Sequence, residues 1–219
     1  MISQNCCGAE RIFDSKKAKK QKKTYLKKGP RGSTRTLIRL LNEYNMEGKS
    51  LLDIGGGVGA IQWHFLEKGG ITTTGIDASP AYINIAREIA EEKKVMDKTT
   101  FINSDVTETC NNVSPHDFVT LDKVVCCYPD YRALLNTACD NSREILALTM
   151  PLSGTIPKVI SWFGNSWLSL NKVPFRTHVH SRKMVDNFIR NKGFRLVHEK
   201  LSFPWYLMVY ENEHRTILD

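Results

Sequence analysis

The stretch LLDIGGGVGA at residues 51–60 decides the fold class of this chain. Residues 50–54 form a short apolar run, typical of a buried strand, and residues 60–67 have the pattern of a helix. Glycines at 55, 57 and 59 lie between them, where they let the backbone turn tightly and let a ligand approach closer than a Cβ would permit. The same spacing satisfies the dinucleotide pattern G-x-G-x-x-A through Ala60, so the turn alone does not select the ligand.

Strands and helices alternate steadily after this stretch. Further strands are predicted at 72–77, 100–103, 117–121 and 144–150, and helices at 81–92 and 131–141. Such alternation predicts an α/β fold, in which right-handed crossovers join the strands of a parallel sheet. Ligands of these sheets bind outside the carboxyl ends of the strands, so the residues that follow each strand are the first candidates for a site.

Acidic residues recur at these strand ends. Asp77 ends the second strand eighteen residues beyond Gly59, where a carboxylate can accept both hydroxyls of a ribose. Asp105, with the backbone beside it, can contact an adenine edge after the third strand, and Asp122 ends the fourth. A single loop acid is ordinarily a solvated residue, but Asp53 and these three together predict a nucleoside-binding edge of the sheet.

The net charge of +8 is concentrated in one segment of the 219-residue chain. Residues 11–39 hold twelve basic residues and one acid, a net +11, so the other residues sum to −3. This local run is typical of a solvated arm and does not by itself indicate a nucleic acid partner. A second helix, at 34–44, has apolar residues at helical spacing and is expected to pack on the body, whereas the helix at 16–28 is expected to be exposed.

Cysteine spacing and hydropathy predict a cytoplasmic protein without a structural metal. No apolar run reaches the roughly 18 to 20 residues that a membrane span needs, and the N-terminus lacks a signal-like apolar core. The cysteines at 6, 7, 110, 126, 127 and 139 match neither a disulfide framework nor the C-x-x-C pairs of a zinc site. We therefore expect reduced thiols and no structural metal site.

The ordered segments LLDIGGGVGA, GIDASPAY, INSDV and FVTLD resemble the motif series of class I S-adenosylmethionine-dependent methyltransferases over residues 50–150. The helix predicted at 181–191 and the strands at 195–201 and 205–211 resemble the antiparallel hairpin that ends the sheet in that family, whereas a nicotinamide-binding fold predicts further parallel strands. The resemblance implies a doubly wound, Rossmann-like, seven-stranded sheet that is mostly parallel, with helices on both faces.

The resemblance also implies a division of the chain and a set of cofactor-binding residues. Residues 1–45 would be a basic N-terminal arm and helical lid, and residues 46–219 the methyltransferase domain, with a substrate-lid insertion at about 151–180. The cofactor would be S-adenosyl-L-methionine and the product S-adenosyl-L-homocysteine. Asp53, Gly55, Gly57, Gly59 and Asp122 are expected around the methionyl part, Asp77 and Ala78 at the ribose, and Asp105 and Val106 at the adenine.

The segment LDKVVCCYPD at 121–130 should face the donor methyl. It resembles the corresponding segment of magnesium-protoporphyrin O-methyltransferases, with Cys127 where that family has a histidine before Tyr-Pro. Residues 25–41 resemble the lid of that family, which makes Tyr25 a candidate catalytic residue. Tyr128 could hydrogen-bond the acceptor, stack on it or be a buried structural residue.

Two further groups are candidates for the reaction. His180 is the candidate base, although a histidine that caps the next helix is the commoner arrangement. Cys126 and Cys127 can pack as small apolar residues, or bind substrate or a soft metal or metalloid, with Cys6 and Cys7 approaching from the N-terminus. The apolar stripe of residues 151–180 is interpreted either as core or as a lid that favours a flat or apolar acceptor.

Methyl transfer to a small-molecule acceptor, with oxygen as the favoured target, is therefore the predicted function. The reaction is an in-line displacement, for which a protein mainly supplies alignment and excludes water. Alternatives are an RNA or protein methyltransferase that uses the basic arm, a thiol or metalloid methyltransferase that uses the cysteine pairs, and a non-catalytic binding module. The sequence does not predict an oligomeric state.

Overall fold

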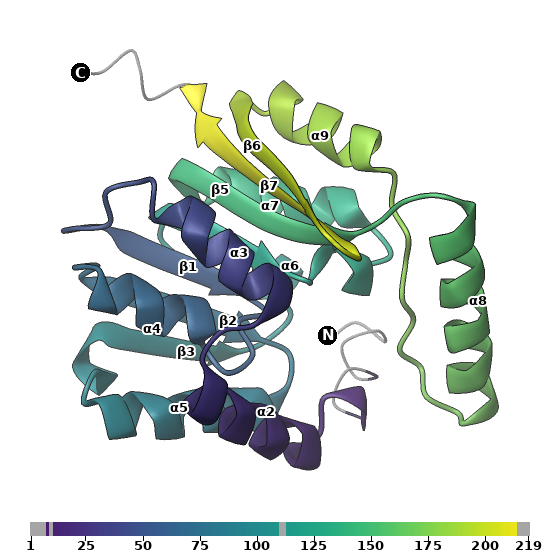
Figure 1. The fold of residues 1–219 in the computed structure, drawn as a ribbon, viewed down its shortest axis with the longest axis horizontal. Helices are drawn as coiled ribbons and strands as arrows, with labels where there is room; N and C mark the ends of the chain where they lie inside the picture. Colours follow the sequence, from purple (N-terminus) through teal and green to yellow (C-terminus); the bar gives the residue numbers. More distant parts are fainter. Residues whose placement is uncertain (1–7, 9–10, 110–112, 214–219) are drawn as a thin grey trace.

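The computed structural model describes residues 8, 11–109 and 113–213, and its centre is one seven-stranded sheet (Figure 1). The strand order is β3-β2-β1-β4-β5-β7-β6, with parallel pairing from β3 to β5 and antiparallel pairing of β7 with both β5 and β6. The strands are β1 (Ser50–Ile54), β2 (Thr72–Asp77), β3 (Thr99–Asn103), β4 (His116–Asp122), β5 (Ser142–Pro151), β6 (Phe194–Ser202) and β7 (Trp205–Asn212). The predicted doubly wound sheet with its C-terminal hairpin is thus confirmed, and the strand order reverses between β1 and β4.

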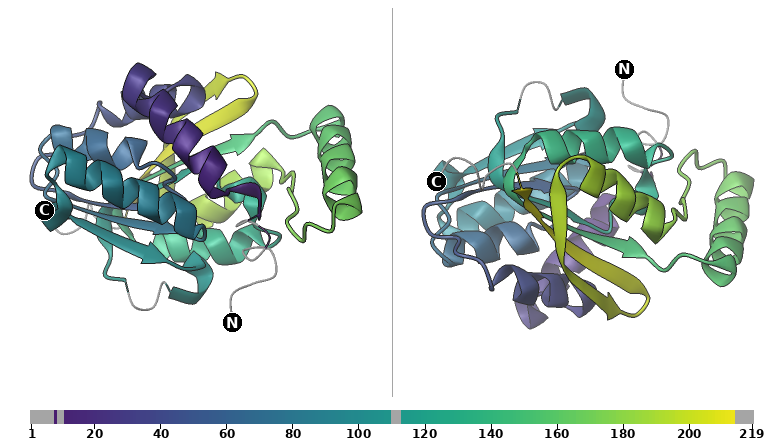
Figure 2. Two further views of the ribbon diagram at one scale, coloured as in Figure 1. Left: turned by 90° about the horizontal axis from the view of Figure 1, so that it is seen from below. Right: turned by 90° about the horizontal axis from the view of Figure 1, so that it is seen from above.

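Helices cover both faces of this sheet (Figures 1 and 2). They are α2 (Ser15–Lys28), α3 (Gly32–Leu41), α4 (Ala60–Glu67), α5 (Pro80–Lys93), α6 (Val106–Thr109), α7 (Tyr131–Asp140), α8 (Thr155–Leu170) and α9 (Arg182–Asn191), with 3-10 turns at Met96–Lys98 and Val125–Cys127. Buried residues of α3 and α4 pack with Leu51 and Phe118 on one face, and those of α7 and α9 pack with Leu52 and Val119 on the other. Alternate residues of each strand thus enter opposite cores.

The two helices of the N-terminal arm differ in how they pack. Leu37, Ile38 and Leu41 of α3 are buried against the sheet, as predicted, although α3 ends at Leu41 and does not extend to Tyr44. Helix α2 was expected to be exposed, but its Ala18 is fully buried and the helix packs along α5. Lys22 of α2 binds Glu88 and Glu92 of α5 at 2.9 and 2.6 Å, so pairing with acids explains how a lysine-rich helix lies on the body.

Helix α8 stands at one side of the molecule, beyond the end of β5 (Figures 1 and 2). Its C-terminal Leu168 packs with Phe175 in a small cluster that is separate from the three clusters around the sheet. Among the described residues, no helix is both long enough and apolar enough to cross a bilayer.

Candidate functional site

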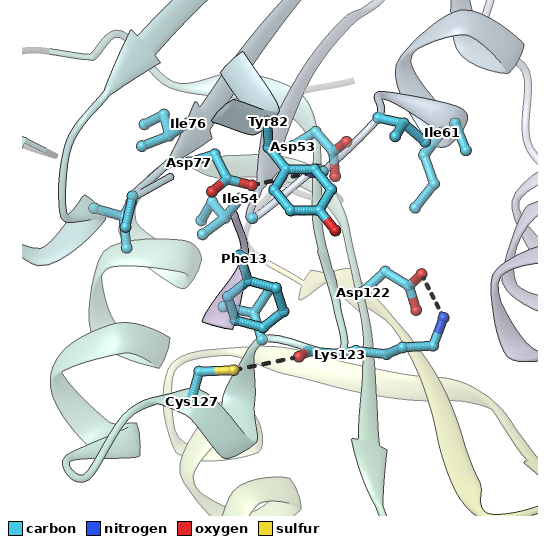
Figure 3. Close-up of a pocket in the computed structure, with 18 of the residues that line it drawn as sticks. Phe13, Asp53, Ile54, Ile61, Ile76, Asp77, Tyr82, Asp122, Lys123 and Cys127 are labelled. Carbon is cyan, nitrogen blue, oxygen red and sulfur yellow. Dashed lines mark hydrogen bonds and ion pairs between the residues drawn. The ribbon is translucent and has the colours of Figure 1, made fainter. Parts of the chain in front are cut away.

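A cavity of about 280 Å³ lies at the carboxyl edge of β1, β2 and β4, where the strand order reverses (Figure 3). Its floor is formed by residues 53–58 of the glycine turn and by Ile76, Asp77 and Ala78. Ser104 and Val106 lie on one side, and residues 122–124 on the other. The cavity is therefore bordered by the residues that follow four successive parallel strands, which is the place where such sheets bind ligands.

The glycine turn lies close against its neighbours. Gly55 has a φ of +65°, and a Cβ there would lie 2.4 Å from Cγ2 of Val124. Gly57 has a φ of +57° and faces the cavity, where its N–H donates to Asp77. Gly59, with a φ of +75°, packs against the indole of Trp63 and is not among the lining residues. Two of the three predicted glycines thus border the cavity, and the third lets α4 begin close to the turn.

Asp77 is held in place by backbone donors. Its Oδ1 accepts the Ser79 N–H at 2.8 Å, and its Oδ2 accepts the Gly57 N–H at 3.1 Å. Burial raises the pKa of this carboxyl to about 6, although the two N–H donors lower it. The result is a carboxylate fixed at the edge of the cavity, with lone pairs that can accept ligand hydroxyls.

Asp53 lies beneath the glycine turn and is fully buried. Its Oδ1 accepts the Thr120 hydroxyl at 2.6 Å and its Oδ2 accepts the Gln62 amide at 3.2 Å, while a Cβ on Gly56 would lie 2.4 Å from the same Oδ2. Burial raises the pKa of the Asp53 carboxyl to about 7. These contacts hold the Asp53 side chain against the glycine turn.

Asp105 and Tyr128 form a direct link between two predicted parts of the site. Asp105 is buried, and its Oδ1 accepts the Thr107 N–H at 3.0 Å and the Tyr128 hydroxyl at 3.0 Å. The cavity is lined by Val106 and Ser104 on either side, and by Tyr128, but not by Asp105 itself. Asp105 thus positions the loop after β3, and Tyr128 joins that loop to the segment after β4.

Asp122 connects the sheet to the N-terminal arm. Its carboxylate accepts the hydroxyls of Thr149 on β5, at 2.7 Å, and of Thr34 on α3. The Lys123 Nζ donates to the Thr34 hydroxyl at 2.7 Å and lies 3.2 Å from Asp122 (Figure 3). Lys123 has a φ of +66°, a strained conformation for a residue with a side chain, and such strain concentrates at functional sites.

The cavity is roofed by residues that the sequence did not single out. It is lined there by Phe13 and Gln21 from the arm and by Phe175 from the segment after α8. The centroid of the Phe13 ring lies 6.0 Å from that of Tyr82 and 5.9 Å from that of Phe175. The Phe13 carbonyl accepts the Ser79 hydroxyl at 2.7 Å, one residue beyond Ala78. The only signal in the sequence was an aromatic residue just before a lysine-rich helix, and nothing local indicates which loop it covers.

The vicinal thiols after β4 occupy different positions. Cys127 lines the cavity and Cys126 does not, although both thiols donate to the Lys123 carbonyl at 3.7 Å. The neighbouring Cys127 thiol lowers the pKa of Cys126. Cys6, Cys7 and Cys110 lie outside the described residues. Within the described part of the chain, no group of three or more His, Cys, Asp or Glu side chains could hold a metal ion.

His180 and Tyr25 do not line the cavity. The His180 Nε2 lies 2.9 Å from the Tyr128 carbonyl oxygen, so this nitrogen carries the proton and donates, and the ring packs on Tyr131 at 4.9 Å. Tyr25 packs with the cluster between α2 and α5, and burial raises its pKa to about 12. In this arrangement His180 supports the Tyr128 segment, and Tyr25 anchors α2.

Solved structures with this fold include several methyltransferases. Magnesium protoporphyrin IX methyltransferase from Synechocystis, with bound S-adenosylhomocysteine, is 17% identical over 81% of each chain, with a TM-score of 0.67. An O-methyltransferase family 2 protein from Planctomyces limnophilus, in complex with apigenin, is 19% identical over 90% of this chain and 61% of its own, with a TM-score of 0.65. A putative RNA methyltransferase from Pyrococcus horikoshii is 16% identical over 81% of this chain and 80% of its own, with a TM-score of 0.55.

Sequence comparison supplies the family. No curated protein matches the chain, but the family model described as a methyltransferase domain matches residues 25–199. This match supports the predicted enzyme. The chain belongs to the methyltransferase domain family, and it is a class I S-adenosylmethionine-dependent methyltransferase whose fold is similar to that of the magnesium protoporphyrin enzyme.

Proposed function

We propose that this chain methylates a small, flat or largely apolar acceptor, with oxygen as the methylated atom. The observation that carries the proposal is the roof of the cavity, where Phe13 of the arm meets Phe175 of the segment after α8 in an edge-to-face contact of 5.9 Å. Two rings in contact over a cavity of about 280 Å³ give it an apolar roof. A roofed cavity of this size suits a small molecule better than a folded RNA or protein.

The residues present fit S-adenosylmethionine as the cofactor. Asp77 offers a carboxylate held by two N–H groups, and Ser104 and Val106 offer backbone and apolar surface one strand away. We assign the ribose to Asp77 and Ala78, the adenine to the loop of Val106, and the methionyl part to the turn at Gly55 and Gly57. When bound, the cofactor supplies an electrophilic methyl group on a positively charged sulfur.

The segment after β4 is assigned to the acceptor. Cys127 and Tyr128 line the cavity beside Phe175, and Tyr128 keeps its hydroxyl on Asp105. In this role the chain excludes water and aligns the acceptor, which accounts for most of the rate enhancement that a methyl transfer requires.

Calorimetry with S-adenosylmethionine tests the cofactor assignment. Asp77→Ala is expected to weaken binding by at least about tenfold, because it removes an acceptor of charge-assisted hydrogen bonds. The matched control is Asp97→Ala, which removes an exposed acid before β3, away from the cavity, and should leave the affinity unchanged. Equal affinity of the Asp77→Ala variant and the unmodified protein would show that the ribose lies elsewhere.

Methyl transfer from labelled S-adenosylmethionine tests the acceptor class. Apigenin, the ligand of the Planctomyces structure, and simpler flat phenols are the probes, and a methyl ether is the expected product. Substitution of Phe175 by Ala should raise KM for the phenol more than it lowers kcat, because we assign this lining residue to the acceptor and not to the reacting sulfur. Labelling of RNA without labelling of any phenol would contradict the proposal.

An RNA acceptor is the second candidate, because most lysines of α2 are exposed, Lys16, Lys19, Lys20 and Lys23 among them. Lysines that bind RNA phosphates release counterions, so the affinity of such binding falls steeply as the salt concentration rises. Retention of the protein on immobilised RNA at low ionic strength would support this candidate, and failure to be retained there would count against it.

A further inference from the structure

The outward face of α8 is largely apolar, with Ser166 as a polar residue within it. Val159, Trp162, Phe163, Trp167 and Leu170 recur at the spacing of one helix face. Trp162, Phe163 and Trp167 are each 63% exposed, and Leu170 is 84% exposed. Figure 2 shows this helix apart from the sheet, and no helix or strand of residues 11–109 or 113–213 covers it in either view. We call these five residues the aromatic face of α8.

The opposite face of the helix is polar and is turned toward the protein. The Asn165 amide donates to the Thr177 carbonyl at 2.8 Å and accepts the Thr177 N–H at 2.8 Å, and the Ser161 hydroxyl donates to the same carbonyl at 3.0 Å. A surface helix of a globular protein ordinarily turns its apolar stripe inward and its polar side outward. Helix α8 is reversed, so the packing of this chain does not explain its aromatic face.

The segment that contains the aromatic face is basic, although Arg182 within it is paired with Glu199 of β6 at 2.8 Å. From Ile145 to Val185 the sequence contains no Asp or Glu, whereas it contains Lys158, Lys172, Arg176, Arg182 and Lys183. Lys172 and Lys183 are exposed. The Arg11 guanidinium donates to the Lys172 carbonyl at 3.1 Å, which joins the end of α8 to the chain that leads into the lysine-rich α2.

We propose that the aromatic face of α8 docks the protein on the surface of an anionic lipid bilayer. Trp and Phe side chains with flanking Lys and Arg are the composition of helices that lie in the headgroup region of such a surface. The helix lies on the bilayer and does not cross it, because its sixteen residues are shorter than the ~20 that a span requires. This inference stands apart from the proposed acceptor, since it uses no residue assigned to catalysis.

A second copy of the chain fits this face less well. Pairing of two α8 helices would bring the basic, acid-free segment of one copy beside that of the other, and like charges in contact oppose association. An anionic bilayer instead neutralises the same charges, and each Lys or Arg near such a surface adds to the attraction. Charge complementarity thus selects the lipid surface.

The docking surface and the cavity share one connection. Leu168, on the inner side of α8, packs with Phe175, which also lines the cavity. Docking therefore places the segment that borders the cavity close to the lipid surface, although the docking itself is measurable without any acceptor.

Sedimentation of the full chain with vesicles tests the proposal. Vesicles of equal parts phosphatidylglycerol and phosphatidylcholine should bind the protein, and vesicles of phosphatidylcholine alone should bind it at least about tenfold less. The double substitution Trp162→Ser with Trp167→Ser should reduce the partition coefficient on the anionic vesicles by about tenfold or more, because both rings are lost from the interface. Lys172→Glu with Lys183→Glu should reduce the preference for phosphatidylglycerol and leave the weak binding to phosphatidylcholine in place.

The matched control is Ile71→Ser, which removes a 54% exposed apolar side chain just before β2, at the opposite end of the sheet from the cavity. This variant should bind vesicles like the unmodified protein, and all variants should keep their affinity for S-adenosylmethionine, which shows that they are folded. Equal binding of the tryptophan variant and the Ile71 variant would overturn the proposal. Self-association in light scattering that the tryptophan substitutions abolish, without vesicle binding, would overturn it in favour of a second copy.

Discussion

The hydroxyl of Thr34, on helix α3 of the N-terminal arm, donates a hydrogen bond to the carboxylate of Asp122 at the end of β4. The two residues are 88 positions apart, and both line the cavity. The Lys123 Nζ donates to the same hydroxyl at 2.7 Å, so Thr34 is both donor and acceptor in one short chain of charge-assisted bonds. The arm is thus fastened to the part of the site assigned to the methionyl group and the acceptor.

Substitution of Thr34 by Val is expected to weaken this attachment and, with it, cofactor binding. Valine keeps the shape of the side chain but leaves Asp122 and Lys123 without the hydroxyl between them. Hydrogen bonds to charged groups contribute about 1 to 3 kcal/mol of interaction free energy, which this variant loses. We expect the Kd for S-adenosylmethionine to rise by about threefold to tenfold, since part of that loss is recovered by the direct ion pair of Lys123 with Asp122.

Thr36→Val is the control for the Thr34 substitution. Thr36 lies on the same helix, and its hydroxyl donates to the Gly32 carbonyl, at 3.3 Å, and not to a residue of the cavity. The Thr36 variant should bind the cofactor like the unmodified protein. Identical affinities of the two variants would mean that the arm is not coupled to cofactor binding through Thr34.

The pKa of Asp77 predicts how cofactor affinity depends on pH. Burial raises this pKa to about 6, and a ribose hydroxyl can donate only to the ionised carboxylate with full strength. Affinity should therefore be constant above about pH 7 and should fall as the pH decreases through about 6, because protonation of Asp77 then competes with the ligand. Calorimetry over this range should show the decrease in the unmodified protein, and a much smaller one in Asp77→Asn, whose affinity is low at every pH. A parallel decrease in both proteins would assign the titration to another group.

Alanine substitutions at Gly55 and Gly48 should separate the free-energy cost of a steric clash from the cost of backbone strain. A Cβ there would meet Val124 at 2.4 Å, and the φ of +65° strains any residue with a side chain. Gly48 has a similar φ of +70°, but no atom lies within 4 Å of its Cβ position. Gly48→Ala should cost about 1 kcal/mol of unfolding free energy from backbone strain alone, and Gly55→Ala more than that.

Denaturant unfolding of Gly48→Ala and Gly55→Ala measures the unfolding free energy that each variant loses. Addition of Val124→Ala to Gly55→Ala should recover part of the difference, because it removes the methyl group that the new Cβ meets. Equal losses of stability at Gly48 and Gly55 would show that the turn moves freely away from Val124.

Local patterns predicted most of the fold, because its strands are short, apolar and separated by amphipathic helices. The bounds of β1, α4 and β2 agree with the prediction residue for residue, since each is limited by a glycine, an acid or a change of period. Asp77, Asp53 and Asp122 were found because they end strands of a parallel sheet. Phe13, Thr34 and Phe175 were not found, because their places depend on how distant segments fold over the cavity.

The reversed orientation of α8 shows the limit of such patterns more clearly. Periodicity identified an apolar stripe between 156 and 170, and an apolar stripe ordinarily faces a core or a pocket. Which side of a helix faces the protein is set by the partner, and here the partner is Thr177, which offers backbone hydrogen bonds to Ser161 and Asn165. The polar side therefore lies inward, and the sequence of the helix alone contains no sign of it.

Asp53 predicts that the stability of the fold decreases as the pH rises. Burial raises the pKa of its carboxyl from 3.8 to about 7, so the folded state holds this proton more tightly than the unfolded chain. The stability linked to the proton is fully present below about pH 4 and is lost as the pH rises toward about 7. Asp53→Asn keeps the acceptor for Thr120 and cannot ionise, so its Tm should vary less over this range and should exceed that of the unmodified protein above about pH 7. A Tm of the Asn variant that lies below that of the unmodified protein at high pH would show that the ionised carboxylate stabilises the glycine turn by more than its burial costs.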